Sequence, residues 1–302
     1  MFLVYTIYSA IFSKGGIYLE NNIKLICIDM DGTLLNSRDE ITDRNKEALR
    51  KARELGVTIA ITTGRLFSSA KYYSDLIGVD TAVLASNGAY IRINQNGKDT
   101  VLETPLPKDI VLSIYNICKK HGLSANFNSW DTLIRENEIP ESHAYHIMNK
   151  NLPDDKKVNF LVDTKDFLNT LKNFNGNILK GIVFEDSSNK DNLWAAKEEL
   201  KETFGDTLHV VSSGANNFEV ILGTISKGIA VAYLAESLNL KPNEVMCLGD
   251  SENDLSMIEY AGIGVAMGNG LELIKDAADY ITDTNDNSGV AKAIEHFVIG
   301  NR

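Results

Sequence analysis

ICIDMDGTLL, residues 26–35, is the most informative stretch of this 302-residue chain. Its first half is apolar and predicts a buried strand, which ends on two carboxylates, Asp29 and Asp31. If the backbone stays extended, their i, i+2 spacing places both carboxylates on one face. Gly32 then permits a tight turn, and Thr33 offers a hydroxyl group close by.

Two carboxylates at one strand end need a positive charge between them. Like charges about 4 Å apart repel by roughly 4 kcal/mol at an effective dielectric constant of about 20. Either a hard divalent cation bound through oxygen atoms or one proton shared by the pair would relieve this repulsion. The stretch therefore predicts a chemical site.

The composition is that of a globular protein, with 44% hydrophobic and 24% charged residues, and the length leaves room for two domains. The net charge of −11 argues against a general affinity for nucleic acid or for anionic membranes. An anionic substrate would therefore need local cations. Cys27, Cys118 and Cys247 are too scattered for disulfides or a zinc site, which fits a reducing cytoplasm. We expect a monomer or a weak homodimer.

Residues 1–22 are expected to lie outside the folded core. Residues 1–12 are apolar, but they are too short to span a bilayer and lack a basic region before them. The Lys-Gly-Gly sequence at 14–16 could be encoded by a ribosome-binding site, and Leu19 could be an alternative start codon. We hypothesise that residues 1–18 are not natural protein. A native N-terminus at Met1, or insolubility after their deletion, would contradict this.

Strand and helix patterns alternate at both ends of the chain. Strands are expected at residues 57–62, 81–86, 89–93, 244–248, 262–267 and 279–282, and helices at 39–55 and 63–77. This alternation predicts an α/β fold, a Rossmann-like three-layer core with a parallel sheet between helices. Ligands bind beyond the carboxyl ends of such strands, where Asp29, Thr63, Ser86 and Asp250 are expected to converge.

The middle of the chain has a different pattern. Its strands alternate between apolar and polar residues, as at 160–163 and 181–184, and residues 208–222 resemble a hairpin. Helical patterns cover residues 108–121 and 189–204. We expect an α+β cap domain, residues 107–222, inserted between two parts of the core, residues 23–106 and 223–302.

Four motifs occur in a fixed order along the chain. They are DMDGTL at 29–34, which includes Asp29 and Asp31, TTGR at 62–65, SKG at 226–228 and GDSEND at 249–254. Together they resemble the haloacid dehalogenase (HAD) superfamily, specifically the Cof-type phosphatases of class IIB, which carry the larger α/β (C2) cap. The resemblance covers residues 23–297. It implies a phosphatase, and the expectations below follow from it.

The resemblance assigns four catalytic residues. Asp29 would be the nucleophile that forms an aspartyl-phosphate, splitting one difficult step into two. Asp31 would protonate the leaving oxygen and then deprotonate water, so its pKa should lie near the working pH. Thr63 would donate a hydrogen bond to the transferring group, and Lys227 would offset its negative charge.

The resemblance also implies a magnesium site. Its ligands would be the Asp29 carboxylate, the Asp31 backbone oxygen and Asp250, with water and phosphate oxygens completing an octahedron. Asp254 would orient a metal-bound water, and Asn253 would lie close to the metal and the phosphate.

Substrate contacts are predicted from both domains. Ser86 and Asn87 lie at a strand end of the core, and the family's cap closes over the cleft, where Trp130 is the favoured contact. His143 and His146 have an i, i+3 spacing, but no third metal ligand accompanies them, so a role on the cap surface is favoured.

Other interpretations remain open at this point. Taken singly, Thr63 could be a helix N-cap, Lys227 a solvated surface lysine, and Asp250 and Asp254 ordinary helix-start carboxylates. The favoured function is magnesium-dependent hydrolysis of small phosphorylated metabolites, either sugar phosphates or cofactor-type phosphates. The alternatives are a phosphomutase and a non-catalytic module that binds a phosphorylated metabolite. A dinucleotide site lacks the G-x-G-x-x-G motif.

Overall fold

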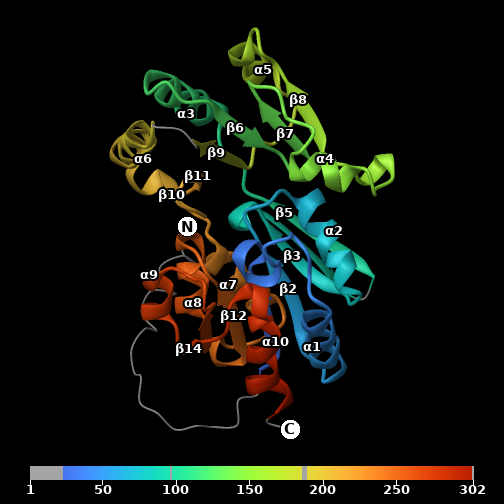
Figure 1. The fold of residues 1–302 in the computed structure, drawn as a ribbon. Helices are drawn as coiled ribbons and strands as arrows, with labels where there is room; N and C mark the ends of the chain where they lie inside the picture. The colour runs from blue at the N-terminus through green and yellow to red at the C-terminus, as the bar shows by residue number, and fades with distance from the viewer. Residues whose placement is uncertain (1–22, 96, 186–188, 301–302) are drawn as a thin grey trace.

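The computed structural model describes residues 23–95, 97–185 and 189–300, and the expectations for residues 1–22 lie outside it. These residues form two bodies, one above the other in Figure 1. The lower body, here called the core, contains an eight-stranded sheet, and the upper body, the cap, contains a six-stranded sheet.

The core sheet is mainly parallel. Its strands, in the order β14-β13-β12-β1-β2-β3-β4-β5, are Tyr280–Ile281, Ile263–Ala266, Val245–Gly249, Leu25–Ile28, Thr58–Thr62, Thr81–Ala85, Tyr90–Gln95 and Lys98–Glu103. The first six are parallel, whereas β4 and β5 add an antiparallel hairpin. The α/β class with a Rossmann-like core is confirmed, with this antiparallel edge as an addition.

Helices flank the core sheet in two groups that pack among themselves. One group is α1 (Asp43–Glu54), α2 (Phe67–Ile77) and α10 (Gly289–Ile294). The other is α7 (Lys227–Ser237), α8 (Leu255–Tyr260) and α9 (Glu272–Ala277). None of the helices in the described ranges is long and apolar enough to cross a bilayer.

Strand β1 lies inside the sheet because all four of its residues are apolar and fully buried. Its last residue, Ile28, pairs with Leu248 of β12 on one side and with Ile61 of β2 on the other. Since the three strands are parallel, the residues that follow them emerge at the same edge of the sheet. This register brings Asp29, Thr63 and Asp250 together.

The cap is an α+β unit. Its strands, in the order β10-β11-β9-β6-β7-β8, are Leu208–Val211, Asn217–Leu222, Lys180–Phe184, Ala125–Asn128, Thr132–Arg135 and Asn159–Val162. Its helices are α3 (Lys108–Lys120), α4 (Ala144–Asn149), α5 (Phe167–Asn173) and α6 (Lys190–Phe204). The predicted hairpin is confirmed, because β10 and β11 pair antiparallel with Leu208 opposite Leu222.

The two faces of the cap sheet differ in polarity because successive strand residues point to opposite sides. One face packs against α3 and α6 and carries the buried residues Phe127, Ile134, Val183, Phe218 and Val220. The other face is turned toward the core and carries Asn126, Asn128, Arg135, Lys180 and Glu219. A polar cap wall therefore faces the edge of the core sheet where Asp29 lies.

Helix α1 is shorter than the periodicity of residues 39–55 predicts. Asp39 has a left-handed backbone, with φ of 57°, and Ile41 forms an isolated β-bridge with Leu35. Thr42 is the N-cap, and its hydroxyl accepts a hydrogen bond from the backbone N–H of Asn45. The apolar Ile41 is buried through this bridge rather than through a helical turn.

Helix α2 also begins later than predicted, at Phe67, with Leu66 as its N-cap residue. The N-cap interpretation of Thr63 is therefore wrong. The Thr63 hydroxyl instead accepts a hydrogen bond from the backbone N–H of Arg65 at 3.1 Å, inside the loop that precedes the helix.

Candidate active site

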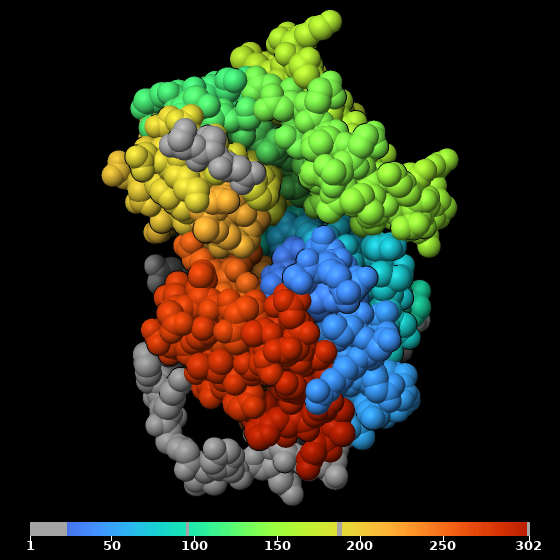
Figure 2. Space-filling view, in the orientation of Figure 1, coloured from blue at the N-terminus to red at the C-terminus, as the bar shows by residue number. Residues whose placement is uncertain are grey.

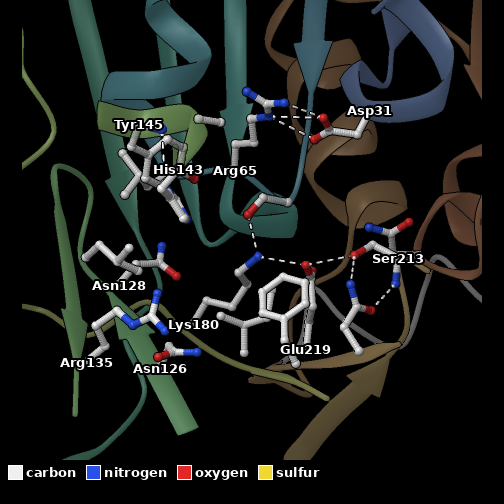
Figure 3. Close-up of a pocket in the computed structure, with 18 of the residues that line it drawn as sticks. Asp31, Arg65, Asn126, Asn128, Arg135, His143, Tyr145, Lys180, Ser213 and Glu219 are labelled. Carbon is white, nitrogen blue, oxygen red and sulfur yellow. Dashed lines mark hydrogen bonds and ion pairs between the residues drawn. The ribbon is translucent and has the colours of Figure 1, made fainter. Parts of the chain in front are cut away.

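A cavity of about 630 Å³ lies between the core and the cap. In Figure 2 the surface is hollowed where the two bodies meet, and Figure 3 shows the side chains inside. The core lines the cavity with Asp29, Asp31 and Arg65. The cap lines it with the polar face of its sheet and with residues around the start of α4. A ligand that fills this cavity would touch both bodies.

Asp29, which directly follows β1, is buried and is 5% exposed. Its Oδ1 atom accepts a hydrogen bond from Lys227 Nζ at 2.6 Å. No group in the described parts of the chain donates a hydrogen bond to Oδ2. Burial, and then the charge of Asp254, raises the pKa of Asp29 well above its usual range, although Lys227 opposes this. Asp29 thus has one oxygen held by the protein and one available to a ligand.

Lys227 is the first residue of α7 and is fully buried, so the surface-lysine interpretation is wrong. Its ammonium group donates to Asp29 Oδ1 and, at 2.5 Å, to Asp254 Oδ1. Burial alone would lower its pKa, but the two carboxylates outweigh burial and raise it. Lys227 therefore stays charged beside Asp29.

Asp254 braces the loop that carries Asp250. Its Oδ2 atom accepts hydrogen bonds from the backbone N–H groups of Asp250 and Ser251, at 2.9 and 3.0 Å. The Asp250 carboxylate itself accepts hydrogen bonds from the hydroxyls of Thr33 and Ser251, at 2.7 and 2.9 Å. Burial and the charge of Asp254 raise the pKa of Asp250 to about 6.

These carboxylates fit a hard divalent cation. One oxygen each from Asp29, Asp250 and Asp254 lies within 4.8 Å of the others. Asp254 already binds Lys227 and two backbone N–H groups, which leaves Asp29 and Asp250 as the carboxylate ligands. Gly32 lies against the Asp250 carboxylate. Its φ is 79°, and a Cβ atom there would lie 2.5 Å from Asp250 Oδ2, so a larger residue would collide with this carboxylate. Mg²⁺ prefers oxygen ligands. Burial, and then the crowding of negative charge, raises the pKa values of Asp29 and Asp250, and a bound cation would offset this charge.

Asp31 has a different partner from Asp29. The extended backbone ends at Asp29, because Leu34 N–H donates back to the Asp29 carbonyl across a turn. Arg65 forms a bidentate ion pair with the Asp31 carboxylate, with distances of 2.5 and 2.9 Å (Figure 3). Burial would raise the pKa of Asp31, but the charge and hydrogen bonds of Arg65 outweigh it and lower the pKa. Asp29 is thus paired with Lys227, and Asp31 with Arg65.

Ser86, Asn87 and Asn253 join the core to the cap. Ser86 Oγ accepts a hydrogen bond from Asn128 Nδ2 at 3.0 Å. Asn87 donates to Glu219, and its Oδ1 atom accepts from Asn253 Nδ2 at 3.2 Å. Ser86 and Asn87 are buried behind the cavity wall, whereas Asn253 lines the cavity.

Trp130 lies outside the cavity. Its ring contacts Phe67 and Tyr90, at centroid distances of 6.2 and 6.4 Å, and the residue is 40% exposed. Among the cap aromatics, Tyr145 and Phe184 line the cavity instead. The structure therefore places Trp130 against the core surface rather than at a substrate position.

The two histidines have separate structural roles. His143 is the N-cap of α4, where its Nδ1 atom accepts a hydrogen bond from Tyr145 N–H at 3.2 Å. His146 packs against the ring of Phe160, with centroids 4.4 Å apart. Neither belongs to the group of described residues that could hold a metal ion.

Sequence reasoning missed the cavity's cations and their partners. Lys180 Nζ lies 3.0 Å from Glu219 Oε1, and Lys180 also donates to the Gly64 carbonyl of the core. Both side chains are almost fully buried. The available signal was a charged residue inside an apolar strand pattern, as at Lys180 and Glu219. For Arg65, the signal was its place two residues after Thr63.

Residues 26–294 match the family of haloacid dehalogenase-like hydrolases. The chain belongs to this family. The hydrolase is 34% identical over 281 residues to 5-amino-6-(5-phospho-D-ribitylamino)uracil phosphatase YcsE of Bacillus subtilis, covering 92% of this chain and 97% of that protein. The predicted family is thereby confirmed, together with the prediction of an enzyme of the phosphatase kind.

Solved structures agree with this assignment. The hydrolase superposes on a haloacid dehalogenase-like hydrolase from B. subtilis with a TM-score of 0.79 and 28% identity, covering 91% of this chain and 100% of the other. It also superposes on the HAD subclass IIB sugar phosphatase BT4131, with a TM-score of 0.73 and 25% identity, covering 92% and 100%. The second match supports the Cof-type, class IIB assignment.

Proposed function

We propose that this hydrolase is a magnesium-dependent phosphatase that acts on small phosphorylated metabolites through an aspartyl-phosphate on Asp29. One observation carries the proposal: a buried carboxylate with one oxygen bound to Lys227, while no described residue donates to the other. Phosphate-monoester hydrolysis has a very high uncatalysed barrier, so the reaction needs such a pre-oriented nucleophile. The free Oδ2 atom is the one that attacks phosphorus.

In the first step, a bond forms between Asp29 Oδ2 and phosphorus while the bond from phosphorus to the ester oxygen breaks. Asp31 gives the leaving oxygen a proton. Lys227 and Thr63 stabilise the negative charge on the transferring group. In the second step, Asp31 takes a proton from water as the water oxygen bonds to phosphorus. The bond from Asp29 to phosphorus then breaks and phosphate leaves.

The ion pair with Arg65 opposes the role of Asp31 as a proton donor. A lowered pKa keeps the carboxyl group ionised, whereas proton donation needs the protonated form. The bidentate contact must therefore loosen as the substrate enters.

Asp29, Asp250 and the Asp31 carbonyl would hold Mg²⁺, which offsets the charge of the carboxylates and the phosphoryl oxygens when bound. Asp254 keeps the Asp250 loop in place for this purpose, and Asn253 faces the cavity beside it. Ser86 and Asn87 support the substrate wall from behind through Asn128 and Glu219.

The substrates that we propose follow from the relatives. YcsE is named for a ribityl phosphate attached to a uracil ring, and BT4131 is named a sugar phosphatase. Both names describe a phosphorylated polyhydroxy chain, which is the class we propose for this enzyme. The three cysteines are free and buried. We place the enzyme in the reducing cytoplasm, where free thiols persist.

The test is the loss of activity on replacing Asp29 by Asn. We expect the wild type to release phosphate from p-nitrophenyl phosphate and from sugar phosphates only when Mg²⁺ is present. We expect Asp29→Asn to lower kcat by at least about 10³-fold, since no nucleophile remains. Its circular dichroism spectrum should be unchanged. Turnover persisting in a variant free of wild-type enzyme would refute the nucleophile assignment.

A further inference from the structure

Arg135 and Asn126 lie side by side on the wall of the cavity opposite the core. Strands β6 and β7 pair antiparallel, with Phe127 opposite Ile134, and the same register places Asn126 opposite Arg135. Directly opposed residues in such a pair share one face of the sheet. Both line the cavity, and Figure 3 shows their side chains next to each other.

Each of these two side chains has a buried polar atom that finds no partner among the described residues. Arg135 Nε and Asn126 Oδ1 are buried, and no described residue forms a hydrogen bond with either of them. Asn126 is only 8% exposed. Burial without a compensating charge lowers the pKa of Arg135, although guanidinium groups remain protonated at neutral pH. A buried donor and a buried acceptor that lack hydrogen bonds cost free energy. A ligand that forms a hydrogen bond with each of them would remove this cost.

The other cations of the cavity are already paired. Arg65 binds Asp31, and Lys180 binds Glu219 and the Gly64 carbonyl. Within the described residues, Arg135 forms no ion pair with any carboxylate. A guanidinium group is a planar fork of donors that matches two oxygen acceptors held in one plane.

We propose that Arg135 and Asn126 form a head-group subsite, which binds a planar group with carbonyl or carboxylate oxygens at the substrate end opposite the phosphate. The inference rests on the proposed phosphatase function and deepens it. Arg135 donates to the acceptor oxygens, and Asn126 Oδ1 accepts from an adjacent N–H or O–H group. A phosphorylated chain without such a head group would leave both protein groups unpaired and would therefore be a poorer substrate.

Two matched substrate pairs test the subsite. Flavin mononucleotide and ribitol 5-phosphate share one phosphorylated chain, but only the first carries a ring with imide carbonyls. 6-Phosphogluconate and sorbitol 6-phosphate differ in one carboxylate. We expect the wild type to favour the head-bearing member of at least one pair by about tenfold or more in kcat/KM, mainly through KM. The pair that shows this preference identifies the head group: a preference for flavin mononucleotide indicates an imide, and a preference for 6-phosphogluconate indicates a carboxylate.

Arg135→Gln should remove this preference, lowering kcat/KM by about 10–100-fold for the favoured substrate and less than about threefold for its truncated partner. Asn126→Ala should act in the same direction. Arg53→Gln, an arginine outside the cavity, is the matched control and should change neither. Because no described residue forms a hydrogen bond with Arg135 Nε, replacing Arg135 should leave Tm unchanged or higher.

A binding assay separates this inference from the proposed function. The Asp29→Asn variant, titrated with flavin mononucleotide and with 6-phosphogluconate, needs no turnover. Adding Arg135→Gln to it should weaken binding of the preferred probe by at least about tenfold. Equal binding with and without Arg135, or equal losses for both members of each pair, would overturn the subsite. Absence of phosphate release from every substrate would instead reject the phosphatase.

Discussion

Asp29, Asp250 and Asp254 lie close together at the carboxyl edge of the core sheet, and Lys227 binds the first and the last of them. Burial, and then the charge of Asp254, raises the pKa of Asp250 to about 6. An ordinary aspartate has a pKa of about 3.9. Between these two pH values the folded protein holds a proton that the unfolded chain has lost. Without metal, the Asp250 contribution to stability therefore falls as the pH rises from about 4 to about 6, and is constant above that.

Magnesium should reverse this pH effect. Metal ligands must be deprotonated, so we expect Mg²⁺ to raise Tm more at about pH 7.5 than at about pH 5, where Asp250 is largely protonated. A chelator should abolish the difference. Thermal unfolding at both pH values, with and without Mg²⁺, measures it. Asp250→Asn is the control, and an equal Mg²⁺ response in that variant would contradict the assignment.

The positions of side chains that directly follow the parallel strands could be predicted from the sequence. The positions of side chains that depend on contact between the core and the cap could not. Asp29 and Asp250 follow adjacent parallel strands, so their convergence follows from topology. The pairing of Lys180 with Glu219 depends on the order of the cap strands and on how the cap sits over Gly64. Periodicity carries no information on either. Trp130 was misplaced for the same reason, because an exposed aromatic on a cap loop can face either side.

The turn at residues 86–88 has an unusual backbone: three consecutive residues have positive φ. Ser86, Asn87 and Gly88 all have positive φ, at 50°, 56° and 94°. Such conformations cost free energy in residues other than glycine and persist only where the surroundings hold them. The turn holds Asn87 between Glu219 of the cap and Asn253 of the core. The Asn-Gly pair in the sequence predicted a turn but not this contact.

Gly88→Ala should destabilise the protein by about 2–4 kcal/mol, since strain and overpacking add. A Cβ atom at Gly88 would lie 2.7 Å from Ala230 Cβ and 2.8 Å from the Ser226 carbonyl, next to the start of α7. Gly78→Ala is the control: its φ is also positive, at 79°, but no atom lies within 4 Å of the new Cβ. Its expected cost is about 1 kcal/mol. Urea unfolding measures both, and equal costs would exclude the clash.

For the whole molecule, the cap and the core are joined by buried polar contacts across the cavity. Lys180 reaches the Gly64 carbonyl, and Glu219 accepts from Asn87. Both charged side chains are nearly inaccessible to water, with 4% and 3% of their surface exposed. Removing one partner of such a pair leaves an uncompensated charge, which costs more than the pair contributes.

Lys180→Met should therefore cost about 3–5 kcal/mol, because Glu219 stays buried without its cation. Adding Glu219→Gln should recover part of this loss, since a neutral amide oxygen can still accept from Asn87 while its NH2 group donates to the Ser213 hydroxyl. Thermal unfolding of the two single variants and the double variant gives the coupling energy. If the two losses simply add, the pair is not coupled and the explanation fails.

The groups proposed to act on phosphorus all come from sequence before residue 107 or after residue 222, whereas the opposite cavity wall comes from the sequence in between. Recombination between related genes could replace the intervening stretch as a cassette and leave the reaction itself unchanged. The incoming cassette would have to supply its own counterparts of Lys180 and Glu219. Without them, the Gly64 carbonyl and the Asn87 amide of the core would lose these hydrogen-bond partners. Grafts that lack these contacts, or the contact of Asn128 with Ser86, would fit the core poorly, while wall positions without a core partner, such as Arg135, could diversify.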